Sequence, residues 1–270
     1  MKQIEYISYG GGSPSLALII LNIQGKVQTL TGKKLDEIIF ADTGWESKIT
    51  IEHIKLHKEY IQDHGYKLIT VKSKLGRLDE YVTKSTLREK VAFGGIPVHK
   101  FSRNNPSKRA IMNRTCTGLF KIAPIHHYIR EKYGTVKRIT QLGIHAHEIH
   151  RVKDSPVKRD TNRFPLVDLG MNRQDCNNLI ESVGLPLLPK SGCVGCPYVK
   201  TSTFKNMLNN GTDDFDRAVK IDETLRLGNV IDHAYLWSEM KPLKTLKENP
   251  QLQLFDQEWD NGCDSGYCFT

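Results

Sequence analysis

Short apolar runs alternate with longer segments of helical character through the first third of the chain. Residues 4–8 and 38–41 have the β-branched and aromatic composition that is typical of buried strands. An apolar stretch at 16–23 and an amphipathic pattern over 48–63 predict the helices that follow these strands. A third strand is expected over 66–71. This order predicts an α/β fold, a doubly wound parallel sheet with helices on both faces.

The periodicity is less regular in the middle of the chain. Residues 75–112 are polar, contain a basic tract, and predict a long loop of the kind that is usually functional or mobile. Helical character returns at 118–133 and at 173–183, and a strand is expected at 138–142 between them. The strand–helix alternation therefore continues after the loop.

Composition and charge narrow the class of protein. Hydrophobic residues at 39% and charged residues at 26% describe a chain that can bury a core, which excludes wholesale disorder. The longest apolar run, 16–23, is too short to span a bilayer, and no signal peptide is visible, so we expect a cytoplasmic protein without a membrane partner. A net charge of +9 favours nucleic acid or phosphate- and sulfate-bearing molecules as partners, although it also describes a plain solvated surface.

Three consecutive glycines stand between the first strand and the first helix. Backbone N–H groups of such a loop can approach an anion, and the helix N-terminus adds partial positive charge. The loop lacks the ending of a Walker A motif and does not match GxGxxG; a tight turn is the alternative. The next strand ends at the same sheet edge in an Asp-Thr-Gly triplet; a helix N-cap is the alternative role of its Asp. The candidate nucleotide-binding residues are Ser8, Gly10, Gly11, Gly12, Ser13, Ser15, Asp42, Thr43 and Gly44.

Cysteines are distributed unevenly, which in a reducing compartment points to metal or redox chemistry. Cys193 and Cys196 form a CxxC motif, which supplies half of a metal site. Cys116 and Cys176 are candidates for the other half. Four thiolates would hold a [4Fe–4S] cluster or, as an alternative, zinc. Free or redox-paired thiols remain open, as does a core position for Cys176.

Several blocks of the sequence resemble the adenine nucleotide alpha-hydrolase (PP-loop) superfamily. Residues 8–15, SYGGGSPS, resemble its modified phosphate loop, and residues 40–46, FADTGWE, are similar to a signature of its PAPS (phosphoadenosine phosphosulfate) reductase-like branch. The likeness continues in order through RTCT at 114–117, GI at 143–144 with Glu148 and Arg151, PLVD at 165–168, MNRQDC at 171–176 and KSGCVGCPY at 190–198. Collinear blocks are more specific than any single motif, and the chain most resembles the PAPS reductase-like proteins common in phage and mobile elements.

The resemblance implies a Rossmann-like domain that binds ATP, PAPS or its unphosphorylated analogue APS. It adds Glu148 and Arg151 to the nucleotide site, and by position on the tail it implies that Cys263 and Cys268 are catalytic. Pro14 stands where the pyrophosphatase members carry Asp, which argues against cleavage of ATP to AMP and pyrophosphate. We expect the nucleotide-binding domain over 1–200, including the CxxC, and a helical extension with the cysteine tail over 201–270.

The function implied by this resemblance is adenine-nucleotide-dependent sulfur chemistry. In the PAPS reductase-like version, an oxidoreductase, a tail thiol attacks the sulfur of a sulfonucleotide and sulfite is released. The alternative is ATP-dependent sulfur transfer to nucleic acid, by thiolation or phosphorothioation. A third hypothesis is a non-catalytic nucleotide-binding protein with a structural metal. A thiol reductant or a sulfur donor protein would be a further partner.

Overall fold

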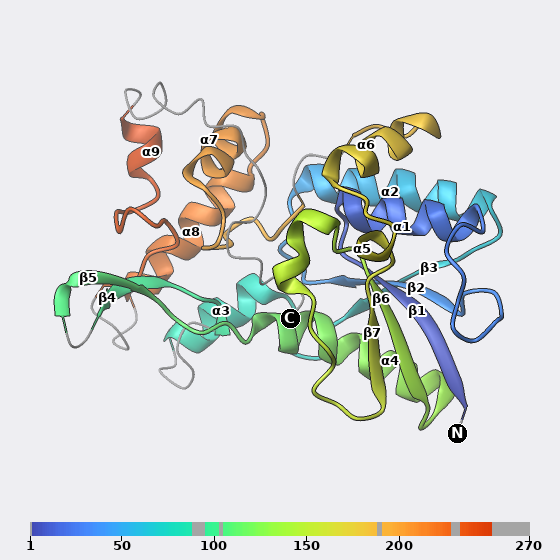
Figure 1. The fold of residues 1–270 in the computed structure, drawn as a ribbon. Helices are drawn as coiled ribbons and strands as arrows, with labels where there is room; N and C mark the ends of the chain where they lie inside the picture. The colour runs from blue at the N-terminus through green and yellow to red at the C-terminus, as the bar shows by residue number, and fades with distance from the viewer. Residues whose placement is uncertain (1, 88–94, 103–104, 188–190, 228–232, 250–270) are drawn as a thin grey trace.

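Five parallel strands form the central sheet of the protein (Figure 1). The computed structural model describes residues 2–87, 95–102, 105–187, 191–227 and 233–249. The strand order is β3-β2-β1-β6-β7. The bounds of these strands are Gln3–Tyr9 for β1, Glu37–Asp42 for β2, Leu68–Lys72 for β3, Lys137–Leu142 for β6 and Asp160–Arg163 for β7. The predicted α/β class and parallel sheet are confirmed.

Helices cover both faces of this sheet because alternate strand residues are apolar on each side. On one face, Ile7 and Ile38 pack beneath α1 (Ser13–Ile23), α2 (Lys48–Asp63) and α6 (Arg173–Ser182). On the other face, Ile4 and Ile39 pack against α4 (Ala123–Tyr133). Nine of the eleven residues of α1 are buried, since this helix lies between the sheet and α6. The sheet is therefore doubly wound, as predicted.

The strand order reverses direction at β1. The chain passes from β1 outward to β2 and β3 on one side, and β6 and β7 lie on the other side. In open parallel sheets, ligands bind in the crevice at the carboxyl ends of the strands where such a reversal occurs. At this point the end of β6 lies close to the start of α1: a Cβ added to Gly143, just after β6, would lie 2.5 Å from the Cα of Ser15.

A second hydrophobic core lies beside the sheet and is built mainly from helices (Figure 1). It contains Phe204, Phe215 and Leu236 together with Trp45 and Val194, so it takes side chains from both sides of residue 200. Its helices are α3 (Leu78–Leu87), α7 (Thr201–Asn209), α8 (Asp214–Leu227) and the short α9 (Thr245–Glu248). The helical character expected for the C-terminal part is present in the described residues.

The prediction of a long loop over 75–112 is wrong for the residues that the structure describes. This segment contains α3 and an antiparallel hairpin of β4 (His99–Ser102) and β5 (Asn105–Ile111). The few apolar side chains of α3, including Leu78 and Val82, are buried in the second core. Tertiary packing thus outweighs a weak local signal.

Three short helical elements lie between residues 118 and 168. They are η2, a π-helix over Gly118–Ile122, η3, a 3-10 helix over Ala146–Arg151, and α5, an α-helix over Pro165–Asp168. Within the described residues, every helix is too short or too polar to cross a bilayer.

Candidate functional site

A pocket opens at the carboxyl ends of β1, β2 and β6, where the strand order reverses. It combines the glycine loop, the start of α1, the CxxC segment and four cationic side chains. Its wall includes Ser8, Gly10, Gly12, Ser13, Pro14, Ser15, Thr43, Arg114, Cys116, Thr117, Lys121, Gly143, His145, Glu148, Arg151, Arg173, Ser191, Gly192, Cys193 and Cys196. Residues expected to bind a nucleotide and residues expected to carry sulfur chemistry therefore share one wall.

The glycine loop is held from both sides. Gly11 has φ +76° and faces α2, where an added Cβ would lie 3.3 Å from Thr50 and Ile54. On the other side, a Cβ on Gly12 would lie 2.8 Å from Oγ of Ser191, a hydroxyl that donates a hydrogen bond to the carbonyl of Gly10. Only glycine combines this backbone conformation with such close packing. The loop is thus fixed against the segment that carries the CxxC motif.

The start of α1 lacks a side-chain cap. Gly12 is the N-cap, and Ser15 turns back into the loop, where its Oγ accepts from the Gly10 N–H at 3.3 Å and donates to the Gly12 carbonyl at 2.9 Å. Pro14 occupies the first turn, where its missing N–H is no loss. The wall at this point offers backbone amides and serine hydroxyls, which suit an anionic group.

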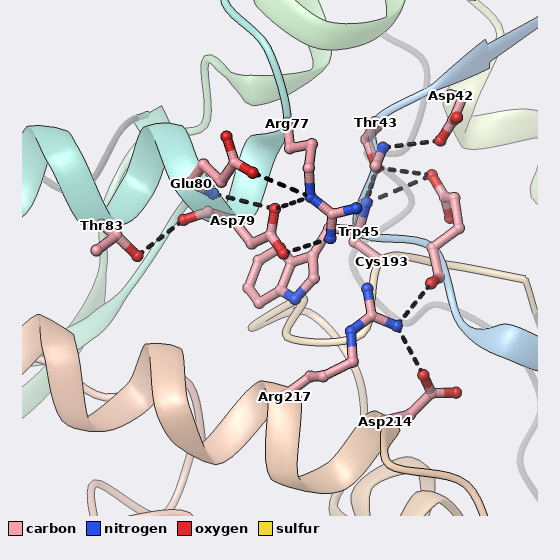
Figure 2. Close-up of polar contacts among 12 residues, drawn as sticks. Asp42, Thr43, Trp45, Arg77, Asp79, Glu80, Thr83, Cys193, Asp214 and Arg217 are labelled. Carbon is pink, nitrogen blue, oxygen red and sulfur yellow. Dashed lines mark hydrogen bonds and ion pairs between the residues drawn. The ribbon is translucent and has the colours of Figure 1, made fainter.

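The Asp-Thr-Gly triplet divides between the pocket and a neighbouring turn. Thr43 lines the pocket. Asp42 instead accepts the Gly44 N–H at 2.7 Å (Figure 2). Its carboxylate also lies 3.4 Å from Nζ of Lys72. Gly44, with φ +74°, faces Arg77. Asp42 and Gly44, like Gly11, therefore lie behind the pocket wall and shape it without forming it.

The cysteines are divided between two cores. Cys116, Cys193 and Cys196 line the pocket. Cys176 is fully buried in the core between α1 and α6, where burial raises its pKa to about 12. Within the described residues, no group of three or more His, Cys, Asp or Glu is arranged to hold a metal ion. The four-cysteine set proposed for a [4Fe–4S] cluster or zinc therefore does not fit this structure, because Cys176 faces the wrong core.

Cys193 contacts a buried carboxylate that the sequence did not single out. Its Sγ lies 3.7 Å from Oε1 of Glu46 and 3.6 Å from Oγ1 of Thr43. Glu46 also accepts from Thr43 at 3.1 Å and pairs with Nζ of Lys121 at 3.6 Å. Burial raises the pKa of Cys193 well above its usual value, Glu46 raises it further, and Lys121 opposes the change. Cys193 is accordingly a neutral thiol at pH 7.

Cys116 has a similar environment. Burial raises the pKa of its thiol, while Arg114 and Lys121 act in the opposite direction. The cations beside these cysteines would stabilise a thiolate once a reaction or a ligand generates one.

Backbone contacts place the CxxC segment at the pocket. The Val194 N–H donates to the Trp45 carbonyl at 2.8 Å, and Glu46 forms a β-bridge with Cys193. Gly195 lies against the Trp45 ring, where an added Cβ would come within 2.4 Å. Figure 2 shows Trp45 and Cys193 beside Arg217, which donates to the Glu46 carbonyl at 3.3 Å and pairs with Asp214. The second core thus supports the cysteine side of the pocket.

Glu148 and Arg151 form part of the opposite wall. NH1 of Arg151 lies 2.6 Å from Oε1 of Glu148, and Nε2 of His145 lies 3.5 Å from Oε2. Burial lowers the pKa of His145, so this ring is neutral at pH 7. Nε of Arg151 and Nδ1 of His145 are buried without a hydrogen-bond partner. The predicted pairing of Glu148 with Arg151 is present, and both residues line the pocket.

Sequence reasoning missed the wall residues Lys121, His145, Arg173 and Ser191, and also Glu46, which contacts Cys193 behind the wall. Most lie in the blocks that carried the family resemblance, so proximity to those motifs was the available signal. Cys263 and Cys268, predicted to be catalytic, lie outside the described residues.

Comparison with solved structures finds chains of similar fold. The chain is similar to the U34-tRNA thiolase NcsA from Methanococcus maripaludis, solved with its [4Fe-4S] cluster, at 12% sequence identity and a TM-score of 0.41. The likeness covers 83% of this chain and 72% of the thiolase chain. No protein-family model and no curated protein matches the sequence.

Proposed function

We propose that this protein is an adenine-nucleotide-dependent enzyme that transfers sulfur to a nucleic acid. One observation carries the proposal: the glycine loop at the start of α1 and three cysteines line the same pocket. A nucleotide-binding protein with a structural metal needs no thiols in its ligand pocket. An enzyme that joins nucleotide and sulfur chemistry does.

The nucleotide phosphates are assigned to the end of the pocket formed by the glycine loop. Backbone amides at the start of α1 and the hydroxyls of Ser13 and Ser15 contact the anion there. Arg151, whose Nε has no partner, and Arg173 add positive charge from the opposite wall. The Glu148 carboxylate keeps the Arg151 guanidinium in place.

The thiols act at the other end of the pocket. Activation of an acceptor oxygen by the nucleotide creates a leaving group that a sulfur nucleophile can displace. A sulfur donor protein first transfers a sulfur atom to Cys193 to form a persulfide; its terminal sulfur attacks the activated acceptor atom and displaces AMP with the acceptor oxygen, as its proton passes to Glu46 beside Lys121. Cys116 of the same wall then attacks the Cys193 sulfur, which releases the acceptor as a thiol and leaves a Cys116–Cys193 disulfide that a thiol reductant reduces. No step requires the predicted cluster.

A nucleic acid acceptor is supported by charge. The net charge of +9 favours a polyanion, and Arg114 lies at the pocket beside Cys116. The second candidate is thiol attack on a sulfonucleotide. Pro14, in place of the pyrophosphatase Asp, favours that version because it removes a group associated with ATP cleavage.

Product analysis separates the two candidates. Purified full-length protein is incubated with ATP, a ³⁵S-labelled donor and RNA or DNA oligonucleotides, and separately with ³⁵S-labelled PAPS. Label in the oligonucleotide, with nucleic-acid-dependent release of AMP, supports sulfur transfer. Labelled sulfite from PAPS supports the second candidate, and neither product overturns both.

Matched cysteine variants test the assignment to the pocket. Cys193→Ala should abolish transfer, because it removes the thiol beside Glu46. Cys176→Ala removes a thiol of the same size from the sheet core and should leave the specific activity and the bound metal content unchanged. A loss of both in Cys176→Ala would restore the four-cysteine site and contradict the arrangement described above.

A further inference from the structure

Positive charge is concentrated in one stretch of the chain. Residues 90–130 contain eight Lys and Arg and no Asp or Glu. Since the whole chain has a net charge of +9, the other 229 residues together contribute only +1. The described part of this stretch includes the β4–β5 hairpin and the segment that leads from it to Cys116.

The hairpin pairs an exposed aromatic ring with an arginine. Phe101 of β4 is the direct partner of Arg109 of β5, so the two side chains lie on one face of the ribbon. Phe101 is 41% exposed, and the Arg109 side chain is 57% exposed, with NH1 at 3.6 Å from Oε2 of the half-exposed Glu239. Lys108 is also exposed and lies on the other face. In Figure 1 the hairpin extends away from the central sheet.

The root of the hairpin is fixed beside the cysteines. His99 and Tyr235 exchange backbone hydrogen bonds of 2.9 and 3.0 Å. Nε2 of His99 lies 2.8 Å from the carbonyl of Pro197, the residue that follows the CxxC motif. The hairpin therefore has a defined position relative to the pocket.

A short segment connects the hairpin to the pocket. Beyond Ile111, the end of β5, only three residues lead to Arg114, a distance of at most about 10 Å. Arg114 lines the pocket, and its guanidinium lies 5.4 Å from the centre of the Tyr198 ring. Cys116 follows two residues later in the same wall.

We propose that the β4–β5 hairpin binds a single-stranded segment of the nucleic acid acceptor and directs it into the pocket. Phe101 stacks on a base, Arg109 and Lys108 contact phosphates, and Arg114 receives the strand at the pocket. This proposal rests on the proposed function, because it names the surface that holds its acceptor.

Two arguments favour a single strand over a duplex. An exposed aromatic side chain among cations is the usual combination for unpaired bases, since a base paired and stacked in a duplex offers no free face. A reacting atom inside a duplex also cannot enter a pocket at the sheet edge unless its nucleotide leaves the stack.

The test is the binding of fluorescein-labelled single-stranded RNA and DNA twelve-mers and of the matching duplexes, followed by anisotropy over a range of salt concentrations. For Lys108→Glu/Arg109→Glu, we expect affinity for single strands to fall about tenfold or more. The slope of log affinity against log salt concentration should become shallower by roughly 1.4, because two phosphate contacts are lost. Phe101→Ala should weaken binding about tenfold with an unchanged salt slope.

The matched control is Lys26→Glu/Lys33→Glu, which makes the same change in charge on exposed lysines elsewhere. It should leave the slope nearly unchanged. Equal losses in both double variants, a preference for duplex, or no binding by the wild type would overturn the proposal. ATP binding is measured on the wild type and on every variant. A wild type that does not bind ATP contradicts the proposed function. A wild type that binds ATP but binds oligonucleotides only weakly contradicts the role of the hairpin alone.

Discussion

The sheet region and the helical second core meet at the pocket but are stabilised in different ways. In the sheet region, mainly apolar strands pack against the almost entirely buried α1, and the buried Glu5 of β1 pairs with Arg163. In the second core, a buried carboxylate of a helix fixes the backbone of segments that follow it in the chain. Asp222 is fully buried and accepts the N–H groups of Leu236 and Leu243 at 2.9 and 2.8 Å. It also pairs with Arg226 at 2.8 Å.

Asp214 is a second buried carboxylate of this kind and lies at the boundary between the two regions. It is fully buried, accepts the N–H of Lys48 at the start of α2, and pairs with Arg217. A single carboxylate thus connects a helix of the sheet region to α8. The contrast teaches that the strands and α1 follow from local apolar patterns, whereas the position of the second core depends on polar contacts between residues distant in sequence.

The largest expected effect breaks the second core. Asp222→Ala leaves two buried N–H groups without an acceptor and Arg226 without its partner, so we expect a loss of about 3–5 kcal/mol in the free energy of unfolding. Urea unfolding measures this change. Asp216→Ala removes an exposed partner of Lys247 from the same helix and should cost less than about 1 kcal/mol. Equal costs for the two variants would show that the buried carboxylate is not a special support of this core.

The same contrast explains what could be predicted from sequence. Residues 48–63 were predicted as a helix and form α2 within those bounds, and the strands near 4–8 and 38–41 were placed within two residues. Their signals are local, because strand burial on both faces requires short apolar runs. The hairpin and α3 were missed because their few apolar residues acquire partners only through contacts with distant helices.

In the candidate site, too, local motifs could be recognised from the sequence, whereas contacts between distant residues could not. The glycine loop and the CxxC were recognisable because their chemistry depends on neighbouring residues. Spacing alone could not decide whether Cys176 is a metal ligand or a core residue, because its position on α6 fits both roles. Glu46 reaches Cys193 across 147 residues, and no local pattern predicts such a contact.

An intermediate effect is expected where the sheet meets the pocket. Gly143→Ala places a Cβ against the backbone of Ser15, and relief of that contact must separate β6 from the start of α1. We expect a loss of about 1–3 kcal/mol in stability and weaker ATP binding, measured by urea unfolding and calorimetric titration. Gly118→Ala is the control, because its Cβ would meet open space. Unchanged ATP affinity in Gly143→Ala would remove the glycine loop from the nucleotide site.

The smallest effect concerns a polar group in the sheet region. His57 is fully buried, its Nδ1 lies 2.5 Å from the hydroxyl of Tyr9, and burial lowers its pKa from 6.5 to about 4. The unfolded chain therefore binds a proton at this ring between pH 6.5 and 4, whereas the folded chain does not. Stability is full above pH 6.5 and falls below it, by about 1–2 kcal/mol between pH 7.5 and pH 5.

His57→Gln removes this titration and should flatten the dependence of the free energy of unfolding on pH over that interval. The wild type, measured over the same interval, is the reference. An unaltered slope in His57→Gln would mean that the ring is protonated in the folded protein. The core beneath α2 would then contain a charged histidine beside the Tyr9 hydroxyl.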